Sequence, residues 1–320
     1  MSKFSKIAAF AAALVLAAGV AQAQSVKGKR VVLLTGPTTT PWVAAYFKQF
    51  IANLTAEGID AKLLSSPGDV AVQAQHLDDA VAQRNDLIVL NAINEVAVVP
   101  ALERAKAAKI PVVLVQQEMP GREDLFVTYV GDNSRARGVA PVETMVKALA
   151  AKGAQPKLAV IQGAPGQFQV IEINKGLKEL LSKTNVQIAA TEGTSWRIDE
   201  AGANARRLLV RFQPQGGLQG FYAMMDPFAT QVIQAIEAGG QKPGQDVLVF
   251  SSSCTKDGIQ AVRDGKLFAT VDNGPVKIAE AASKVVVQVL RGERTAKTIY
   301  TPSQVVTKEN VEQHAASCTF

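Results

Sequence analysis

Short apolar runs alternate along the chain with segments whose apolar residues recur at helical spacing. Residues 31–35 form the first compact apolar run, which is typical of a strand buried on both faces of a sheet. The next segment predicts a helix, because one helical face collects Val43, Phe47, Phe50, Ile51 and Leu54. Gly58 is a stop signal for that helix.

The alternation of strand and helix continues through both halves of the chain. In the first half it predicts strands at residues 61–64, 87–90 and 111–115, with helices near residues 71–84 and 95–108. In the second half it predicts strands at residues 158–161, 186–191, 221–223 and 247–250. Strands that alternate with helices build parallel sheets. We therefore expect an α/β fold of two doubly wound parallel-sheet lobes in tandem.

Two short motifs predict helix starts in the second half. Asp132-Asn133-Ser134 supplies side chains that cap a helix N-terminus. Asp226-Pro227 predicts another start, with Asp226 as the capping residue and Pro227 as the first helical residue.

The first residues have the features of a cleaved export signal. Lys3 and Lys6 precede an apolar stretch over residues 7–20, and Ala21-Gln22-Ala23 offers a small-x-small cleavage site. The stretch has about 14 residues, whereas a bilayer-spanning helix needs about 20. We therefore expect a signal peptide over residues 1–23, cleavage after Ala23, and a protein of the periplasm.

The remaining chain, of just under 300 residues, is long enough for two lobes with separate cores. The net charge of +6 for the whole chain includes Lys3 and Lys6 of the predicted signal. The small positive excess is spread along the chain without a basic run, which argues against a nucleic-acid partner.

Cys254 and Cys318 are the two cysteines of the chain. In an oxidising compartment such a pair usually forms a disulfide. This one would close a loop of about 65 residues, which the loop-entropy account values at about 3–4 kcal/mol. A catalytic thiol or a metal ligand is the alternative, but the C-x-x-C spacing of common metal sites is missing. We expect the disulfide and no metal site.

Residues with catalytic chemistry are sparse. We expect neither His76, in a predicted helix, nor His314, in the C-terminal tail, to serve an active site. Ser251-Ser252-Ser253 lacks the Gly-x-Ser-x-Gly context of a nucleophile elbow. Gly163-Ala164-Pro165-Gly166 lacks the Lys-Ser/Thr ending of a phosphate loop. We expect no catalytic residue and no cofactor, and an exported enzyme is the least favoured alternative.

The loops after the predicted strands are the place for a ligand, because ligands of open α/β sheets lie beyond the carboxyl ends of the strands. Several motifs in and near these loops, taken in order, resemble one family. They are Thr38-Thr39-Thr40-Pro41-Trp42, Asn91, Ile110-Pro111-Val112-Val113-Leu114, Gly131-Asp132-Asn133, residues 163–176, Asp257-Gly258 and Asp264-Gly265-Lys266-Leu267. With these motifs the chain resembles the ribose- and galactose-type periplasmic sugar-binding proteins of ABC transporters.

The resemblance covers essentially the whole chain after the predicted signal. It implies the type I periplasmic binding protein fold, in which a multi-crossing hinge joins two lobes. The N-terminal lobe would hold residues 24–131 and 274–302, and the C-terminal lobe residues 132–273 and 303–320. Hinge closure around a ligand is the expected motion.

The resemblance also implies a ligand site. Family members stack the apolar faces of a sugar between aromatic rings and bind its hydroxyl edge by hydrogen bonds. Trp42 and Trp196 take the stacking positions, and the alternative for each is a place in a core. The implied ligand-binding residues are Thr40, Trp42, Asn91, Gln116, Gln117, Gln167, Trp196, Met225, Asp226, Ser251 and Asn273. The implied partners are a sugar-like small molecule and the membrane permease of an ABC transporter, with the binding protein as a monomer.

The polar positions depart from the family pattern. Gln116-Gln117 stand where family members carry an Asp-Arg pair, and Ile171 stands where they carry a second arginine. Met225 and Ser251 stand in place of an Asn and an Asp. Fewer charge-assisted hydrogen bonds make an ordinary pentose or hexose less favoured. A deoxy-sugar, a polyol, a nucleoside or a small aromatic compound is an alternative solute. A ligand-sensing module that serves a chemoreceptor is an alternative role for the protein.

Overall fold

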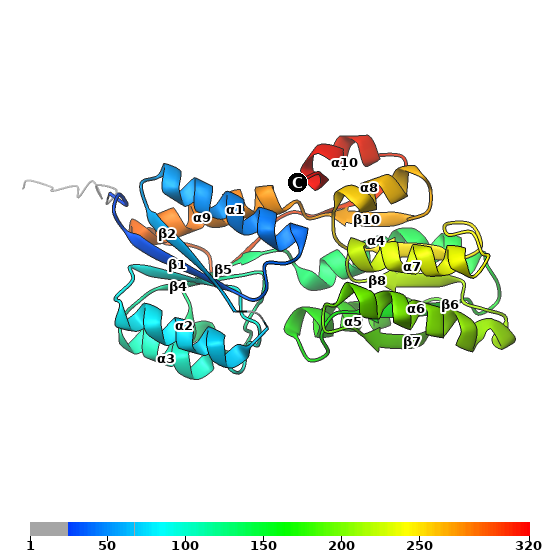
Figure 1. Cartoon of the computed structure of the whole chain (residues 1–320), viewed down its shortest axis with the longest axis horizontal. Coiled ribbons are helices and arrows are strands. Elements are labelled where there is room, and N and C mark those ends of the chain that lie inside the picture. Colours follow the sequence, from blue (N-terminus) through cyan, green and yellow to red (C-terminus); the bar gives the residue numbers. More distant parts are fainter. Residues whose placement is uncertain (1–24, 67) are drawn as a thin grey trace, which may run out of the picture.

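The structure is a computed structural model, and it describes residues 25–66 and 68–320. The predicted signal peptide and its cleavage after Ala23 lie outside the described residues. The described chain forms two lobes that lie side by side, each a sheet covered by helices (Figure 1).

The first lobe has a six-stranded parallel sheet in the order β11-β5-β4-β3-β1-β2. Its strands are β1 (Arg30–Thr35), β2 (Asp60–Ser65), β3 (Leu87–Leu90), β4 (Val112–Val115), β5 (Thr128–Gly131) and β11 (Thr298–Tyr300). One face packs against α1 (Pro41–Ala56) and α9 (Pro275–Leu290). The other face packs against α2 (Val70–Ala82) and α3 (Val99–Ala107), with the short helix η1 (Glu123–Leu125) beside them.

The second lobe repeats this plan in the order β12-β10-β9-β8-β6-β7. Its strands are β6 (Lys157–Gln162), β7 (Gln187–Gly193), β8 (Gly220–Ala223), β9 (Leu248–Ser251), β10 (Ala269–Asp272) and β12 (Gln304–Thr307), which runs antiparallel to β10. One face packs against α4 (Ser134–Ala150) and α5 (Phe168–Leu181). The other packs against α6 (Ile198–Phe212), α7 (Asp226–Ala238), α8 (Lys256–Arg263) and α10 (Val311–Cys318), with η2 (Gln213–Gln215) after α6.

Each sheet places the first strand of its lobe between the second and the third. This reversal of strand order is the doubly wound arrangement, and it leaves a ligand position beyond the carboxyl ends of the strands. The prediction of two doubly wound parallel-sheet lobes is confirmed.

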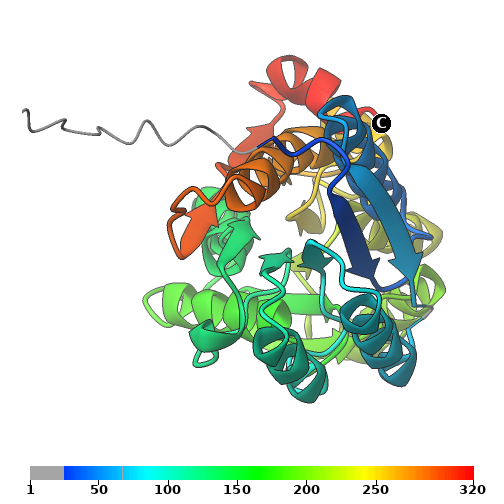
Figure 2. The same ribbon diagram turned by 90° about the vertical axis from the view of Figure 1, so that its left-hand side faces the viewer.

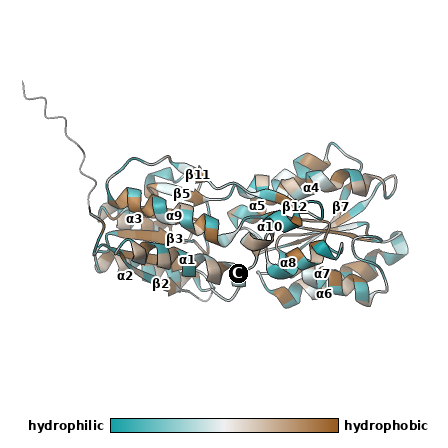
Figure 3. Ribbon diagram, turned by 90° about the horizontal axis from the view of Figure 1, so that it is seen from above, coloured by the Kyte–Doolittle hydropathy of each residue, from teal (hydrophilic) through white to brown (hydrophobic). Residues whose placement is uncertain are grey.

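The central strands are buried on both faces because helices cover both sides of each sheet. Every residue of β3, β4, β8 and β9 is buried. Figure 3 shows these layers from above, with hydrophobic strands between helices whose outer sides are more hydrophilic. Burial on two faces is the reason why compact apolar runs, and not alternating ones, predicted these strands.

The chain crosses between the lobes three times. It leaves the first sheet between β5 and α4, returns between β10 and α9, and leaves again between β11 and β12. Figure 2 shows the returning segment, in orange, beside the blue elements at the start of the chain. We place the lobe boundaries within these crossings.

Side-chain caps fix several helix starts. Asn133 caps α4, because its side chain accepts a hydrogen bond from Ala136 N at 2.9 Å, which confirms the predicted start. The prediction for Asp226 is wrong: Met225 is the N-cap residue of α7, and Asp226 is already helical. The reason is that Thr255 and Thr270 occupy the carboxylate of Asp226, which is therefore turned away from its own helix start.

Within the part of the chain that the structure describes, none of the helices combines the length and the apolar character that a membrane crossing needs.

Candidate ligand site between the lobes

Trp42 lies in the first turn of α1, after the loop that follows β1. Its ring stacks on Tyr46, one turn further along, with centroids 5.4 Å apart and planes 12° apart. Its Nε1 donates to the carbonyl oxygen of Asn273 at 3.1 Å. Asn273 belongs to the hinge crossing between β10 and α9, so this bond fixes the indole against the hinge.

Gln116 and Gln117 follow β4, where the backbone turns sharply. Gln116 has a φ of 64°, in the left-handed region that non-glycine residues rarely occupy. Backbone strain of this kind costs about 1–3 kcal/mol and clusters at functional sites. Gln117 and the nearby Tyr46 are buried. Among the described residues, Gln117 Oε1 has no hydrogen-bond partner, and Tyr46 Oη and Gln116 Nε2 make no well-formed hydrogen bond, although these two side chains are close enough for Gln116 to lower the pKa of Tyr46.

These three atoms belong to the side of the interlobe region that the first lobe forms, which we call its wall. They give this wall neutral hydrogen-bonding groups. A buried polar atom without a partner costs about 1–3 kcal/mol. Burial also raises the pKa of the Tyr46 phenol far above its usual value, so the hydroxyl is neutral. The wall therefore offers neutral hydrogen-bonding groups, both donors and acceptors, to a molecule that fits against it.

Thr40 and Asn91 lie on the same wall and shape its loops. Thr40 is the N-cap residue of α1, and its side chain makes no capping hydrogen bond. Asn91 follows β3, and its Nδ2 donates to Thr35 Oγ1 at 3.2 Å. The carbonyl oxygen of Asn91 accepts from Gln73 Nε2 at 2.9 Å, which ties the loop to α2.

Trp196 lies on the opposite lobe, in the turn between β7 and α6. Ser195 and Trp196 have φ values of 41° and 64°, so this turn is also strained. The indole stacks on Phe228 with centroids 6.1 Å apart and planes 20° apart. It also lies directly over Gly163, where an added Cβ would come within 2.1 Å of the ring. The close approach of the ring requires glycine at position 163.

Gln167 joins the two lobes at the start of α5. Its Oε1 accepts from Trp196 Nε1 at 2.6 Å, and its Nε2 donates to the carbonyl of Ile93 at 3.1 Å. The backbone N–H of Phe168 approaches Glu95 Oε1 at 3.4 Å. Because Ile93 and Glu95 follow β3 of the first lobe, the strand-end loops of the two lobes touch here.

Asp226 is fully buried and its carboxylate has protein partners on both oxygens. Thr270 Oγ1 donates to Oδ1 at 2.6 Å, and the backbone N–H of Thr255 donates to Oδ2 at 2.9 Å. A Cβ at Gly258 would lie 1.8 Å from Oδ2, so the start of α8 is built around this group. Desolvation raises the pKa of Asp226 to about 6.

Ser251 and Met225 lie near Asp226. Ser251 ends β9 and is buried, and its Oγ makes no well-formed hydrogen bond among residues 25–66 and 68–320, although it is close enough to Asp226 to lower the pKa of that carboxyl. Met225 is half-buried and packs against the core on the α7 side of the sheet. Ile171 lies on α5 and is 41% exposed, so it offers an apolar surface in place of a charge.

A buried ion pair connects the hinge to the second lobe. Asp132 lies in the crossing after β5, and its Oδ2 is 2.7 Å from Arg137 Nε of α4. Arg137 also donates to the carbonyl of Ser252 at 2.7 Å and to Gln169 Oε1 at 3.3 Å. Asn273 Nδ2 donates to Asp132 Oδ2 at 3.4 Å. A chain of polar contacts thus runs from Trp42 through the hinge to the floor of the second lobe.

Arg137 and Tyr46 are the two residues of this region that sequence reasoning missed. Tyr46 follows Trp42 by four residues, so it lies on the same face of the helix, and this spacing was the available signal. Arg137 lies in the first turn of a helix, where an arginine is ordinarily exposed, and its contacts with Asp132, Ser252 and Gln169 come from distant parts of the chain. We call Trp42, Tyr46, Gln116, Gln117, Trp196 and Asn273 the interlobe site.

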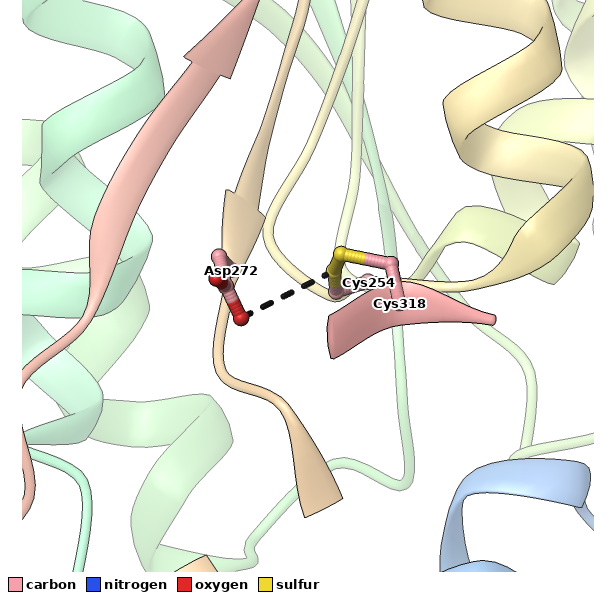
Figure 4. Close-up of side chains that lie close together, drawn as sticks. All are labelled: Cys254, Asp272 and Cys318. Atoms are coloured by element: carbon pink, nitrogen blue, oxygen red, sulfur yellow. Dashed lines mark hydrogen bonds between the residues drawn. A yellow bond between two sulfur atoms is a disulfide. The ribbon is translucent and has the colours of Figure 1, made fainter. Parts of the chain in front are cut away.

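A disulfide joins Cys254 to Cys318, with Cα atoms 5.0 Å apart, which confirms the predicted pairing. It pins α10 beside Asp272, whose Oδ1 lies 3.9 Å from Cys254 Sγ (Figure 4). The other oxygen of Asp272 contacts His314 Nδ1 at 2.9 Å and accepts from Ser317 Oγ at 2.6 Å. These hydrogen bonds lower the pKa of Asp272, although burial opposes them as the largest single effect. With the sulfur atoms joined, neither is a thiolate that binds a metal.

Two surface hollows lie away from the interlobe site. One, of about 330 Å³, is lined by Val276, Lys277 and residues of α10. The other, of about 400 Å³, lies near the turn before β9 and includes Lys242 and Asp264. Neither contains a residue of the predicted ligand site. In this arrangement Gln117 and Asn273 of the interlobe site are nearly inaccessible to solvent, with an exposure of 6% each.

Two lobes joined by three crossings, with facing strand-end loops and an indole on each, define a protein that encloses a small molecule between its lobes. The family described as "Periplasmic binding protein domain" matches residues 31–294. The chain therefore belongs to the periplasmic binding protein family, which consists of solute-binding proteins.

Known relatives extend this assignment. The ribose import binding protein RbsB of Bacillus subtilis (strain 168) is 24% identical over 253 residues, which cover 79% of this chain and 78% of that protein. Among solved structures, this chain is similar to the arabinose-binding component of an ABC transporter from Shewanella sp. ANA-3, which was solved with L-arabinofuranose. The two superpose with a TM-score of 0.82 at 24% identity, and the match covers 90% of this chain and 95% of that one. A solute-binding protein of Bacillus halodurans C-125, solved with myo-inositol, has a TM-score of 0.81 at 20% identity and coverage of 91% and 99%.

The predicted family and the type I periplasmic binding protein fold are confirmed by these matches. The ligand roles of the individual residues stay predictions.

Proposed function

We propose that this protein captures a small sugar or sugar-like solute between its lobes and delivers it to the membrane permease of an ABC transporter. The observation that supports the proposal is the interlobe site, which has one indole on each lobe and neutral polar side chains after the strands of the first lobe. A sugar matches such a site because its ring has apolar faces and a hydroxyl edge. The names of the relatives, a ribose importer and an arabinose-binding component, support the same class of solute.

The charges near the site favour a neutral solute. Arg137 is paired with Asp132, and Asp226 is held by threonines, so both kinds of charge are engaged with protein groups. Gln116 and Gln117 carry no charge and offer amide donors and acceptors to hydroxyl groups. A charged solute would find no free counter-charge among these residues.

Within this proposal the residues divide by role. Trp42 and Trp196 contact the faces of the solute, and Gln116, Gln117, Tyr46 and Asn273 contact its edge. Thr40, Asn91, Met225 and Ser251 border the site. Asp226 does not contact the solute in this proposal; it holds the start of α8 in place.

The cellular setting follows from the same family. We infer that residues 1–23 are a signal peptide removed after Ala23, and that the mature protein works in the periplasm as a monomer without a cofactor. We also infer that it is not an enzyme. His314 contacts the carboxylate of Asp272 beside the disulfide and is not part of the interlobe site.

A solute other than an ordinary sugar is the second candidate, and two residues favour it. Ile171 and Met225 put apolar surface where family sugar binders carry polar side chains. A polyol, a nucleoside or a small aromatic compound would need fewer charge-assisted hydrogen bonds there. The relative solved with myo-inositol is an example of a polyol complex on this fold. A module that presents its closed form to a chemoreceptor would use the same site.

A thermal-shift screen of the mature protein tests the solute class. Pentoses, hexoses, deoxy-sugars, polyols, nucleosides and small aromatic acids are compared. At a hundredfold excess over the dissociation constant, a true solute stabilises the fold by about 2.7 kcal/mol, which raises the melting temperature by a few degrees. A response to sugars or polyols supports the proposal, whereas a response confined to nucleosides or aromatic acids replaces the sugar with the second candidate.

A further inference from the structure

Both the oxygen and the nitrogen of the Gln167 amide form hydrogen bonds, and the two partners belong to different lobes. Oε1 accepts from Trp196 in the second lobe at 2.6 Å, while Nε2 donates to the carbonyl of Ile93 in the first lobe at 3.1 Å. An indole N–H only donates and a carbonyl only accepts, so the amide has one orientation that satisfies both. A carboxylate at this position would keep the first bond and lose the second.

The residue after Gln167 adds a second contact between the lobes. The N–H of Phe168 is in the first turn of α5, where no helical carbonyl is available to it. Glu95 of the first lobe approaches this N–H at 3.4 Å. The carboxylate also lies at the helix end that favours negative charge. The loop after β3 therefore meets the start of α5 at two adjacent points.

Trp196 depends on groups outside its own loop for its position. The left-handed φ values of Ser195 and Trp196 cost about 1–3 kcal/mol each, and such strain persists only where surrounding contacts hold it. The contacts here are the ring of Phe228, the bare backbone of Gly163 and the amide of Gln167. If the lobes separate, Gln167 loses Ile93 and is free to turn away from the indole. The position of Trp196 is thereby coupled to lobe closure.

We infer that Gln167 is a latch residue, which positions Trp196 and holds the lobes together with a single amide group. The free protein then populates the closed arrangement before any solute binds. The inference rests on the proposed function, in which Trp196 is half of the stacking pair. A solute that holds Trp196 in its strained position favours the closed form further by population shift.

The test measures lobe separation in ligand-free protein by double electron–electron resonance. Spin labels are attached through non-natural residues at Ala82 of α2 and Lys178 of α5, which are both exposed and lie in different lobes. The wild type should show a closed and an open distance. In Gln167→Glu the ratio of closed to open should fall about tenfold, since the loss of one hydrogen bond is worth about 1.4 kcal/mol.

Two further variants and a control make the result specific. Gln167→Met lacks both bonds and should lower the ratio at least as far. Gln187→Glu adds the same charge at an exposed position of β7 and should leave the ratio unchanged. Trp196→Phe keeps an aromatic ring but has no N–H, and combined with Gln167→Met it should have no additional effect, because the two residues act through one bond.

The melting temperature of each variant, recorded alongside, should stay near that of the wild type, which separates a latch from a general loss of structure. An unchanged ratio in both Gln167 variants overturns the latch, and so does a single open distance in the wild type. Either result leaves the proposed function standing, because the thermal-shift screen measures solute binding separately.

Discussion

The wall from the first lobe leaves polar atoms of Tyr46, Gln116 and Gln117 without well-formed hydrogen bonds among the described residues. The wall from the second lobe carries more charge, yet Arg137 and Asp226 have protein partners. The two lobes share one strand order, so the difference comes from side chains and not from topology. Ser251 Oγ of the second lobe also lacks a well-formed hydrogen bond among the described residues. We therefore propose only that the first lobe supplies most of the hydrogen bonds to a solute, while the second lobe keeps its charged groups in fixed contacts with protein.

The ion pair at the hinge gives the largest expected effect. Asp132→Asn leaves Arg137 as an uncompensated buried charge, and we expect the free energy of unfolding to fall by about 3–5 kcal/mol. Urea denaturation followed by circular dichroism measures the change. The double variant Asp132→Asn, Arg137→Met removes both charges and should recover most of the loss. A loss below about 1 kcal/mol in the single variant would contradict the view that the second lobe is held by paired charges.

The pH dependence of stability tests the buried carboxyl of the second lobe. The pKa of Asp226 is about 6 in the folded protein, against an ordinary value of 3.8, because burial disfavours the charged form. The folded state therefore binds more protons than the unfolded state between these pH values. This group alone makes the protein about 2 kcal/mol less stable at pH 7 than at pH 4.

Asp226→Asn removes this titration. The difference in unfolding free energy between wild type and variant should shift by about 2 kcal/mol in favour of the variant as the pH rises from 4 to 7. Denaturation series at several pH values measure it, and taking the difference cancels groups such as Asp272, whose pKa moves the opposite way. A flat difference would show that Asp226 titrates near its ordinary pKa.

The smallest expected effect comes from comparing two buried glutamines of the first lobe, Gln73 and Gln117, each replaced by leucine. Gln117 has an unpaired Oε1, whereas Gln73 donates to Asn91 and accepts from Ile93. Gln73→Leu should cost about 1–3 kcal/mol of stability, because it leaves its partners unsatisfied. Gln117→Leu should not lower stability, because it removes a buried oxygen that has no partner, and it should weaken solute binding about tenfold, or about 1.4 kcal/mol. Calorimetric titration with a solute from the screen measures the second effect, and equal stability losses in the two variants would contradict the proposed role of Gln117.

Many strands of the sheet interiors were predictable from the sequence, because strands buried on two faces are continuous apolar runs, and the edge strands β2 and β7 were predicted as well. The other two edge strands, β11 and β12, were not predicted, since they are short and partly exposed, and they pair with strands far away in the chain. The stacking roles of Trp42 and Trp196 were predicted from the family resemblance and stay predictions. The burial of Arg137 was not predicted, because it involves an ion pair with Asp132 that the sequence pattern does not reveal. The start of α7 was predicted one residue too late, because Thr255 and Thr270 hold the Asp226 carboxylate away from the helix N-terminus.

The crossings of the hinge also decide the order in which the molecule is assembled. The first lobe begins with β1, but its sheet is closed by β11 and its helix α1 packs against α9, both from the last fifty residues. Domains generally fold as units, in the order of their synthesis. Here the lobe that is translated first is completed last, and most of the second lobe emerges in between. A nascent chain therefore lacks a finished first lobe until it is nearly whole.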